Sequence, residues 1–172
     1  MNIISIDFSK VSTGIFIYVN KKESWHTIKI KESIKLPDAL CILYDKIGKL
    51  LDDKKYDYGL IEWIYRGESL QKISGVICLV FAQHKIPLVQ VPAMTWKSIL
   101  DMCKVDKKHN LDKYLAGIKT IYGRSFATTD EADAFLMYQA VKNIENTDKI
   151  SPVITKIKKQ LFKINLDNKI KA

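Results

Sequence analysis

The stretch IISIDFSKVSTGIFIYV, residues 3–19, contains the strongest structural signal in the chain. Its first half is a nearly continuous β-branched run that ends at Asp7, and its second half is another such run that begins at Gly14. Runs of this composition predict buried strands, and the short connection predicts an antiparallel hairpin. Because an unpaired carboxylate is costly to bury, Asp7 is a candidate functional residue.

Downstream of this hairpin the hydrophobic period changes several times between that of a strand and that of a helix. A strand that is reached through a helix is predicted to run parallel to the first strand. The order therefore predicts an α/β protein with a mixed five-stranded sheet flanked by helices, in which the first strand is central. The remaining strands are predicted at 25–30, 57–63 and 87–91, and helices at 36–51, 69–84, 92–100, 111–122 and 129–145.

Length and charge set the overall class of protein. The chain has 172 residues, 47% of them hydrophobic, which is enough for one compact domain over residues 1–148. Residues 149–172 carry seven lysines against one aspartate and predict a basic C-terminal helix or tail. The formal net charge of +9 favours a polyanionic partner, either nucleic acid or an acidic membrane face.

Cysteine usage and hydropathy indicate the compartment. Cys41, Cys78 and Cys103 are odd in number and far apart, which favours reduced, buried thiols over disulfides or a zinc site. The apolar run before Asp7 is too short for a signal peptide. No apolar stretch approaches the ~18 residues of a membrane-spanning helix, so no such helix is expected. Of the two polyanionic partners, we expect nucleic acid and no membrane. We therefore expect a cytoplasmic protein.

Three further carboxylates stand in similar contexts. Glu62 ends the predicted strand 57–63, and Asp130 and Asp133 are spaced i, i+3 at the start of the last predicted helix, on one face of it. Together with Asp7 they form a set of acids from distant segments, which is typical of a divalent-metal site. Two-metal phosphodiester hydrolysis uses such carboxylates around ions about 3.5–4 Å apart.

Each acid also has a plain structural interpretation. Asp130 suits a first-turn or capping position in a helix, and Asp7 suits a turn after a strand. Glu62 and Asp133 fit such roles less well, because apolar residues flank both of them. The neighbouring Glu131 is expected to be solvated, although its position leaves the identity of the fourth ligand open.

The motifs together resemble, in chain order, those of the RuvC-type Holliday junction resolvases, members of the ribonuclease H-like superfamily. Phe8 and Ser9 stand where that family usually has a proline and a glycine, and the divergence is similar to that of phage and viral members. The resemblance covers about residues 2–145 and rests on segments 6–14, 60–65, 75–89, 92–97 and 130–135.

The resemblance implies a metal-dependent endonuclease that nicks four-way (Holliday) and other branched DNA junctions. Asp7, Glu62, Asp130 and Asp133 would be both catalytic residues and ligands of two Mg²⁺ ions, with Mn²⁺ able to substitute. In the family an aromatic residue shortly after the second acid enters the junction, and Tyr65 is the matching residue here.

Family enzymes act as homodimers, with the helix after the second acid at the interface. The matching segment is 69–84, and packing inside one protomer explains its apolar stripe equally well. The members of that stripe are Ile73, Ile77, Val80, Phe81 and His84.

Basic residues would hold the DNA backbone. Lys97, Lys104, Lys107 and Lys108, with the tail lysines, are expected to contact phosphates, so that binding weakens steeply with salt. Trp63 or Tyr65 would stack on unpaired bases. For the lysine-rich connection around Lys107, a solvated loop is the alternative.

Three other functions remain open. A different ribonuclease H-like nuclease would cut RNA–DNA hybrids, and a non-catalytic module would bind DNA junctions without cutting them. Asp7 with Gly14 also resembles the first phosphate loop of actin and sugar-kinase folds. Those folds need a second domain and a glycine-rich adenosine loop, whereas this chain has only 7 glycines. Retention of all the acids favours the catalytic readings.

Overall fold

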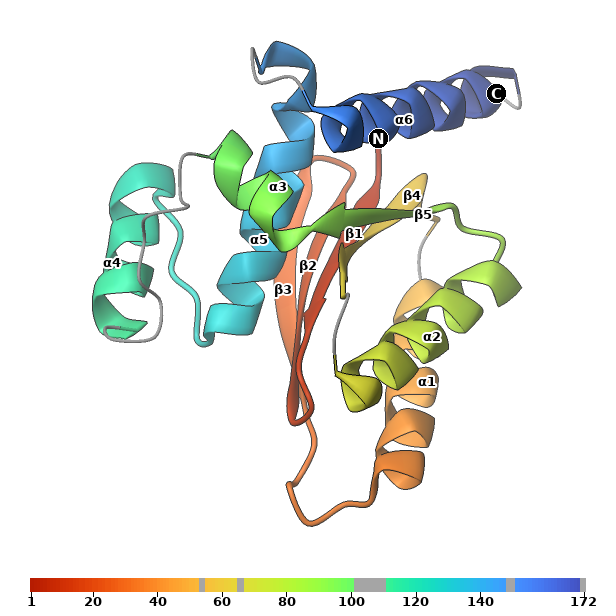
Figure 1. Ribbon diagram of the computed structural model, residues 1–172, viewed down its shortest axis with the longest axis vertical. Coiled ribbons are helices and arrows are strands. Elements are labelled where there is room, and N and C mark those ends of the chain that lie inside the picture. The colour runs from red at the N-terminus through yellow and green to blue at the C-terminus, as the bar shows by residue number, and fades with distance from the viewer. Residues whose placement is uncertain (53–54, 65–66, 101–110, 148–150, 171–172) are drawn as a thin grey trace.

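The computed structural model describes residues 1–52, 55–64, 67–100, 111–147 and 151–170. Its centre is a mixed five-stranded sheet in the order β3-β2-β1-β4-β5 (Figure 1). β2 and β3 are antiparallel to their neighbours, whereas β4 and β5 run parallel to β1. The predicted mixed sheet with a central first strand is thus confirmed. The strands are β1 (Ile3–Phe8), β2 (Ser12–Val19), β3 (Lys22–Lys29), β4 (Tyr58–Trp63) and β5 (Leu88–Pro92).

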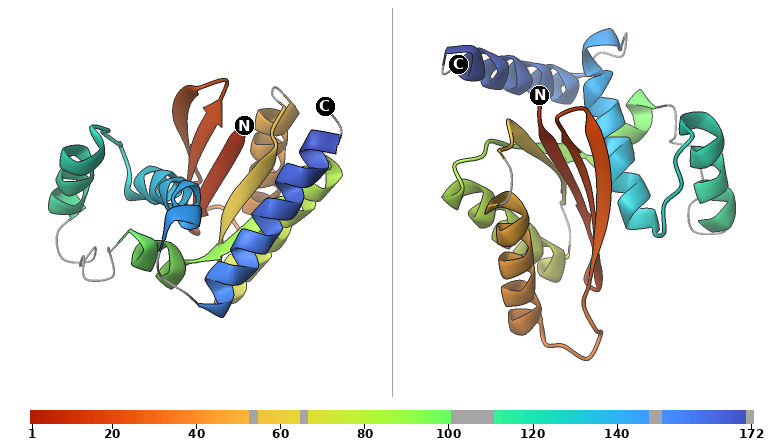
Figure 2. Two further views of the ribbon diagram at one scale, coloured as in Figure 1. Left: turned by 90° about the horizontal axis from the view of Figure 1, so that it is seen from above. Right: turned by 180° about the vertical axis from the view of Figure 1, so that it is seen from behind.

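Helices cover both faces of the sheet (Figure 2). One pair, α1 and α2, packs on one face, and α5 lies across β1 and β2 on the other. α3 and α4 lie beside α5, and α6 packs against β5. The helices are α1 (Leu36–Asp52), α2 (Glu68–Gln83), α3 (Ala93–Ile99), α4 (Leu111–Tyr122), α5 (Thr129–Lys142) and α6 (Pro152–Ile170), with a 3₁₀ turn at Ile144–Asn146.

Side chains along β1 point alternately to the two faces of the sheet, and the core has one half on each face. Ile4 and Ile6 are fully buried and pack on the α1/α2 side, whereas Ile3 packs on the α5 side. Because successive strand residues point to opposite faces, Asp7 belongs to the α5 side with Ile3. The same period in β4 places Leu60 in the α5-side cluster and Ile61 in the other.

The second hairpin is tighter than the composition predicts. β3 begins at Lys22, three residues before the predicted strand, and Val19 pairs with Lys22 across a two-residue turn. That turn is made by Asn20 and Lys21, whose φ angles are 52° and 63°. Two-residue hairpin turns favour such positive angles, for which glycine is the usual sequence signal. Neither position is glycine, so the early start of β3 could not be read from composition.

The apolar stripe of α2 packs inside the protomer. Ile73, Ile77, Val80 and Phe81 are at most 1% exposed, and they belong to the core half on the α1/α2 side. Phe81 lies against Gly59 of β4, where an added Cβ would approach its ring to 2.1 Å. The plain packing interpretation of the stripe is confirmed, so any contact between protomers through α2 would use its outer face.

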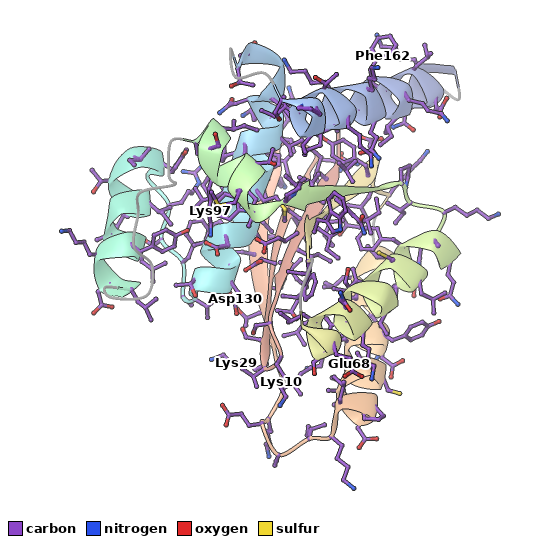
Figure 3. The ribbon with its side chains drawn as sticks, viewed as in Figure 1. Lys10, Lys29, Glu68, Lys97, Asp130 and Phe162 are labelled. Atoms are coloured by element: carbon purple, nitrogen blue, oxygen red, sulfur yellow. The ribbon has the colours of Figure 1, made fainter. Side chains whose placement is uncertain are left out.

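α6 joins the core on the α5 side through Ile154, Ile157 and Leu161. Phe162, the residue after Leu161, is 71% exposed and points away from the body of the protein (Figure 3). The expectation of buried cysteines was wrong for Cys41, which is exposed. Within the described residues, no helix has the length and apolar character needed to cross a membrane.

Candidate functional site

Two of the four candidate acids meet at the ends of adjacent parallel strands. Ile6 of β1 pairs with Ile61 of β4, so Asp7 and Glu62 are the next residues along the two strands. Both belong to the face that α5 covers. The predicted meeting of these two side chains at one end of the sheet follows directly from this register.

A glycine brings the third acid to the same place. Gly14 is the partner of Asp7 across the β1–β2 pair. A Cβ at Gly14 would lie 2.0 Å from the carbonyl carbon of Asp130 and 2.3 Å from the amide nitrogen of Glu131. Only a residue without a side chain permits this approach of the helix backbone to the strand. The first turn of α5, with Asp130 near the sheet in Figure 3, therefore lies beside Asp7.

Hydrogen bonds fasten this end of α5. The hydroxyl of Thr128 caps the helix by accepting a hydrogen bond from the Glu131 amide at 3.2 Å. The Glu131 carboxylate accepts from the Thr27 hydroxyl at 2.5 Å and from the Ala127 amide at 2.9 Å. Glu131 was expected to be solvated but is only 5% exposed. Its carboxylate oxygens hold α5 to β3, which gives this residue a structural role.

The fourth acid is buried and hydrogen-bonded. Asp133 is 5% exposed and accepts a hydrogen bond from the Tyr114 hydroxyl of α4 at 2.5 Å. Burial raises the pKa of Tyr114 far above its usual value, and the charge of Asp133, its hydrogen bond and the charge of Asp7 raise it further. Because both carboxylates act on this one phenol, Asp7 and Asp133 lie in the same electrostatic environment.

Glu62 is oriented by a buried tryptophan. The Trp96 indole N–H donates to a Glu62 carboxylate oxygen at 3.3 Å, and Trp96 is 1% exposed. The ammonium of Lys97 lies 5.1 Å from the centre of the same indole ring. Neither Trp96 nor Tyr114 was singled out in the sequence, because nothing in the local pattern distinguishes a site residue from an ordinary core aromatic.

The four acids surround one end of the sheet without forming a compact cluster. Among the described residues, no three His, Cys, Asp or Glu side chains are close enough together to hold one metal ion. Trp96 and Tyr114 each engage one of the carboxylates, Glu62 and Asp133. Repulsion between like charges also keeps carboxylates apart when no cation compensates them. As a donor set, carboxylate oxygens still match what Mg²⁺ and similar hard cations prefer.

Positive side chains flank this end of the sheet. Figure 3 shows Lys10 and Lys29 beyond Asp130, and Lys97 on α3 beside α5. Lys97 was expected from the sequence. Lys10 and Lys29 were not, because they become neighbours only when the β1–β2 turn and the end of β3 are brought together. Other expected DNA contacts lie outside the described residues: Tyr65, Lys104, Lys107 and Lys108.

The mixed sheet, its strand order and the helices on both faces define a ribonuclease H-like α/β fold. Among solved structures, this fold is similar to that of RuvC. RuvC of Thermus thermophilus in complex with a Holliday junction substrate matches with a TM-score of 0.64 and 13% sequence identity, over 85% of this chain and 95% of that one. RuvC of the same organism in another structure matches with the same score and identity, over 85% and 96% of the two chains.

A fowlpox virus resolvase in complex with Holliday junction DNA gives a TM-score of 0.45 at 18% identity, over 87% of this chain and 100% of that one. No protein-family model and no curated protein matches the sequence. At 13% identity the likeness to RuvC establishes the fold of this chain. The residues of the site itself are what bear on function.

Proposed function

We propose that this protein is a divalent-metal-dependent endonuclease that nicks four-way and other branched DNA. The observation that carries this proposal is the meeting of Asp7, Glu62 and the first turn of α5 at one end of the sheet, on one face. These acids come from three separate segments of the chain, and a shared divalent cation would offset the repulsion between their charges. The likeness to the RuvC fold supports the proposal, since one of the matching structures is RuvC in complex with a Holliday junction substrate.

Asp7, Glu62, Asp130 and Asp133 would hold the metal, and Mg²⁺ is the ion that we propose, with Mn²⁺ as a substitute. When bound, the metal would supply Lewis-acid polarisation of the phosphodiester and compensate the charge that develops on its oxygens. The protein contributes a fixed frame for the ligands. Trp96 sets the orientation of Glu62, and Tyr114 sets that of Asp133.

Lysines at the edge of the site would bind the DNA backbone. Lys10 and Lys29 extend from the same end of the sheet as Asp7 (Figure 3). Lys97 lies on α3, the helix that follows β5, and β5 is the strand that pairs with β4 beside Glu62. Contacts of this kind position the phosphates but do not read the sequence. The net charge of +9 supplies the long-range attraction for a polyanion.

Symmetric resolution of a four-way junction requires nicks in two DNA strands of like polarity, and a symmetric dimer places one active site on each of them. We propose that the second copy packs on the outer face of α2. That face carries Gly75, where an added Cβ would meet nothing within 4 Å, and Leu79, which is 51% exposed. Leu79→Asp is expected to shift the molecular mass in light scattering from dimer to monomer. An unchanged mass would exclude this face as the interface.

The test of the function is a cleavage assay on a synthetic four-way junction. Matched linear duplex and RNA–DNA hybrid serve as controls, each with and without Mg²⁺. Paired nicks near the branch point that need Mg²⁺ and are absent from the linear duplex would establish junction resolution. Cleavage of the hybrid alone would keep the site and change the substrate to RNA in hybrids. Junction binding without cleavage in Mg²⁺ or Mn²⁺ would refute the catalytic proposal.

A further inference from the structure

A hollow of about 600 Å³ opens beside Glu62, between the end of β4 and the helices α2, α3 and α6. Its lining is mostly apolar, and among the described residues that line it Glu62 is the one carboxylate. The volume lies in the usual range for small-molecule sites, and such sites combine an apolar lining with a few polar groups. Apart from Glu62, none of the residues that line this hollow has a role in the proposed binding of metal and phosphate.

We propose that this hollow receives one unstacked nucleobase of the nucleotide whose phosphate lies at Glu62. This inference rests on the proposed function and specifies its substrate: branched DNA with an unpaired or easily unpaired base next to the phosphate that is cut. A base and its phosphate are joined through a single sugar. A phosphate held at Glu62 therefore leaves its own base as the nearest planar, largely apolar group able to enter.

The lining residues suit a base. Trp63 and Leu70 form part of the wall, and Met94 of α3 borders the hollow with 67% of its surface exposed. Tryptophan offers a flat surface for base stacking, and methionine is a flexible, polarisable side chain that adapts to different planar ligands. An exposed methionine on a surface helix is not unusual by itself. Met94, however, lines a hollow next to Glu62, where it would contact a base that enters.

Charge around the hollow also fits a nucleotide. Lys156 of α6 places its ammonium 5.7 Å from the centre of the Trp63 ring, and Lys97 lies three residues after Met94 on α3. An apolar hollow whose bordering helices carry lysines matches the flat faces of a base that is attached to an anionic backbone. A second copy of this basic chain would bring further positive charge to the same place, which disfavours it as the occupant.

Entry of a base into the hollow requires that the base leave the duplex stack. That step is least costly where the base is already unpaired or mismatched. At the branch point of a four-way junction the continuous stack is interrupted, so the base pairs there open more easily than those inside a linear duplex. The hollow thereby gives the site a physical reason to prefer branched DNA that its carboxylates alone do not provide.

The experiment is a double-mutant cycle between the hollow and the base. The variants are Met94→Asp and, as a matched control, Ile121→Asp, which introduces the same charge at another exposed apolar residue, on α4. Each full-length protein is titrated in Ca²⁺ with a normal four-way junction and with junctions that lack the base on either side of the cleaved phosphate. Because every junction keeps its phosphates, a general charge effect of the new aspartate cancels between them.

The expected result is that Met94→Asp weakens binding of the normal junction about ten-fold or more, and weakens binding of one abasic junction much less. Ile121→Asp should affect all of the junctions equally. If Met94→Asp weakens normal and abasic junctions by the same factor, the hollow does not hold a base. The coupling is read from affinity, so it is independent of cleavage. A protein that shows it and cuts nothing would refute the nuclease proposal alone.

Discussion

Gly14 of β2 lies directly against the backbone of Asp130 in the first turn of α5. A Cβ on residue 14 would be 2.0 Å from the carbonyl carbon of Asp130 and 2.3 Å from its carbonyl oxygen. Gly14 is also the strand partner of Asp7. This one close approach therefore sets the distance between two candidate metal ligands that are more than a hundred residues apart in the chain.

Gly14→Ala is expected to lower the free energy of unfolding by at least about 1–3 kcal/mol, because rigid backbone atoms must move to admit a methyl group. Cleavage should fall more than ten-fold as Asp130 moves away from Asp7. Urea denaturation and junction cleavage measure the two effects. Gly117→Ala is the matched control, since a Cβ there meets nothing within 4 Å, and helix propensity should stabilise it by up to about 1 kcal/mol. Equal stability of the two variants would contradict the close approach.

Asp7→Asn is expected to abolish metal-dependent cleavage, because the amide keeps the shape of the side chain and loses the charge that binds a cation. Junction binding should persist or tighten, since one negative charge that repels phosphate is removed. Gel-based cleavage and a binding titration in the same buffer measure both. Asp45→Asn makes the same change on the exposed side of α1 and should cut normally. Cleavage by Asp7→Asn at the wild-type rate would show that the site is elsewhere.

Tyr114→Phe removes the hydroxyl that donates to the buried Asp133. We expect the free energy of unfolding to fall by about 1–3 kcal/mol, the range for leaving a buried acceptor without its donor. The cleavage rate should also fall, because Asp133 loses the contact that orients it. Tyr44→Phe provides the control: its hydroxyl donates to Gln83 at an exposed position, where the loss should be within about 0.5 kcal/mol. An equally small effect at Tyr114 would count against its positioning role.

Lys97→Gln is expected to reduce the salt dependence of junction binding. Each phosphate contact that is lost lowers the slope of log K against log salt by about 0.9. Affinities measured between low and moderate salt give that slope. Lys46→Gln, on the exposed surface of α1 across the sheet from the site, should leave it unchanged. A slope that is unaltered in Lys97→Gln would remove this lysine from the DNA contact.

Alkaline pH is expected to destabilise the protein in part through Tyr138. Burial, followed by the neighbouring Tyr18 and Glu23, raises the pKa of Tyr138 from 10.0 to about 12. An unfolded tyrosine loses its proton near pH 10, whereas the folded one keeps it, so this stabilisation is complete below pH 10 and is lost as pH rises through 12. Denaturation between pH 9 and 12 should show a shallower fall for Tyr138→Phe. An identical fall in wild type and variant would contradict the shift.

The strands, the helices and the positions of Asp7 and Glu62 at strand ends were predictable from the sequence. Strand and helix periods and the ends of apolar runs are local features. The burial of Glu131, by contrast, could not be predicted from local features. It lies between Asp130 and Ala132 in a first turn, where glutamate is ordinarily solvated, yet it is buried through contacts with Thr27, more than a hundred residues earlier. No pattern in the neighbourhood of residue 131 contains that information.

The supporting aromatic residues were unpredictable for the same reason. Tyr114 and Trp96 look like ordinary helical core residues in the sequence, and both do belong to the core cluster on the α5 side. Their second role, a hydrogen bond to a candidate ligand, depends on how α3 and α4 stand relative to β4 and α5. That relation arises from packing between elements, which local periodicity does not encode.

By itself, the sequence determined the order of strands and helices, the mixed sheet, and the presence of acids at the ends of β1 and β4, since each depends on short-range periodicity and strand direction. Only the tertiary structure decided which side chains surround those acids. The contact of Gly14 with Asp130, the donors Trp96 and Tyr114, and the hollow beside Glu62 all exist because separate elements pack together. Packing depends on the shapes of surfaces that meet only after the chain has folded.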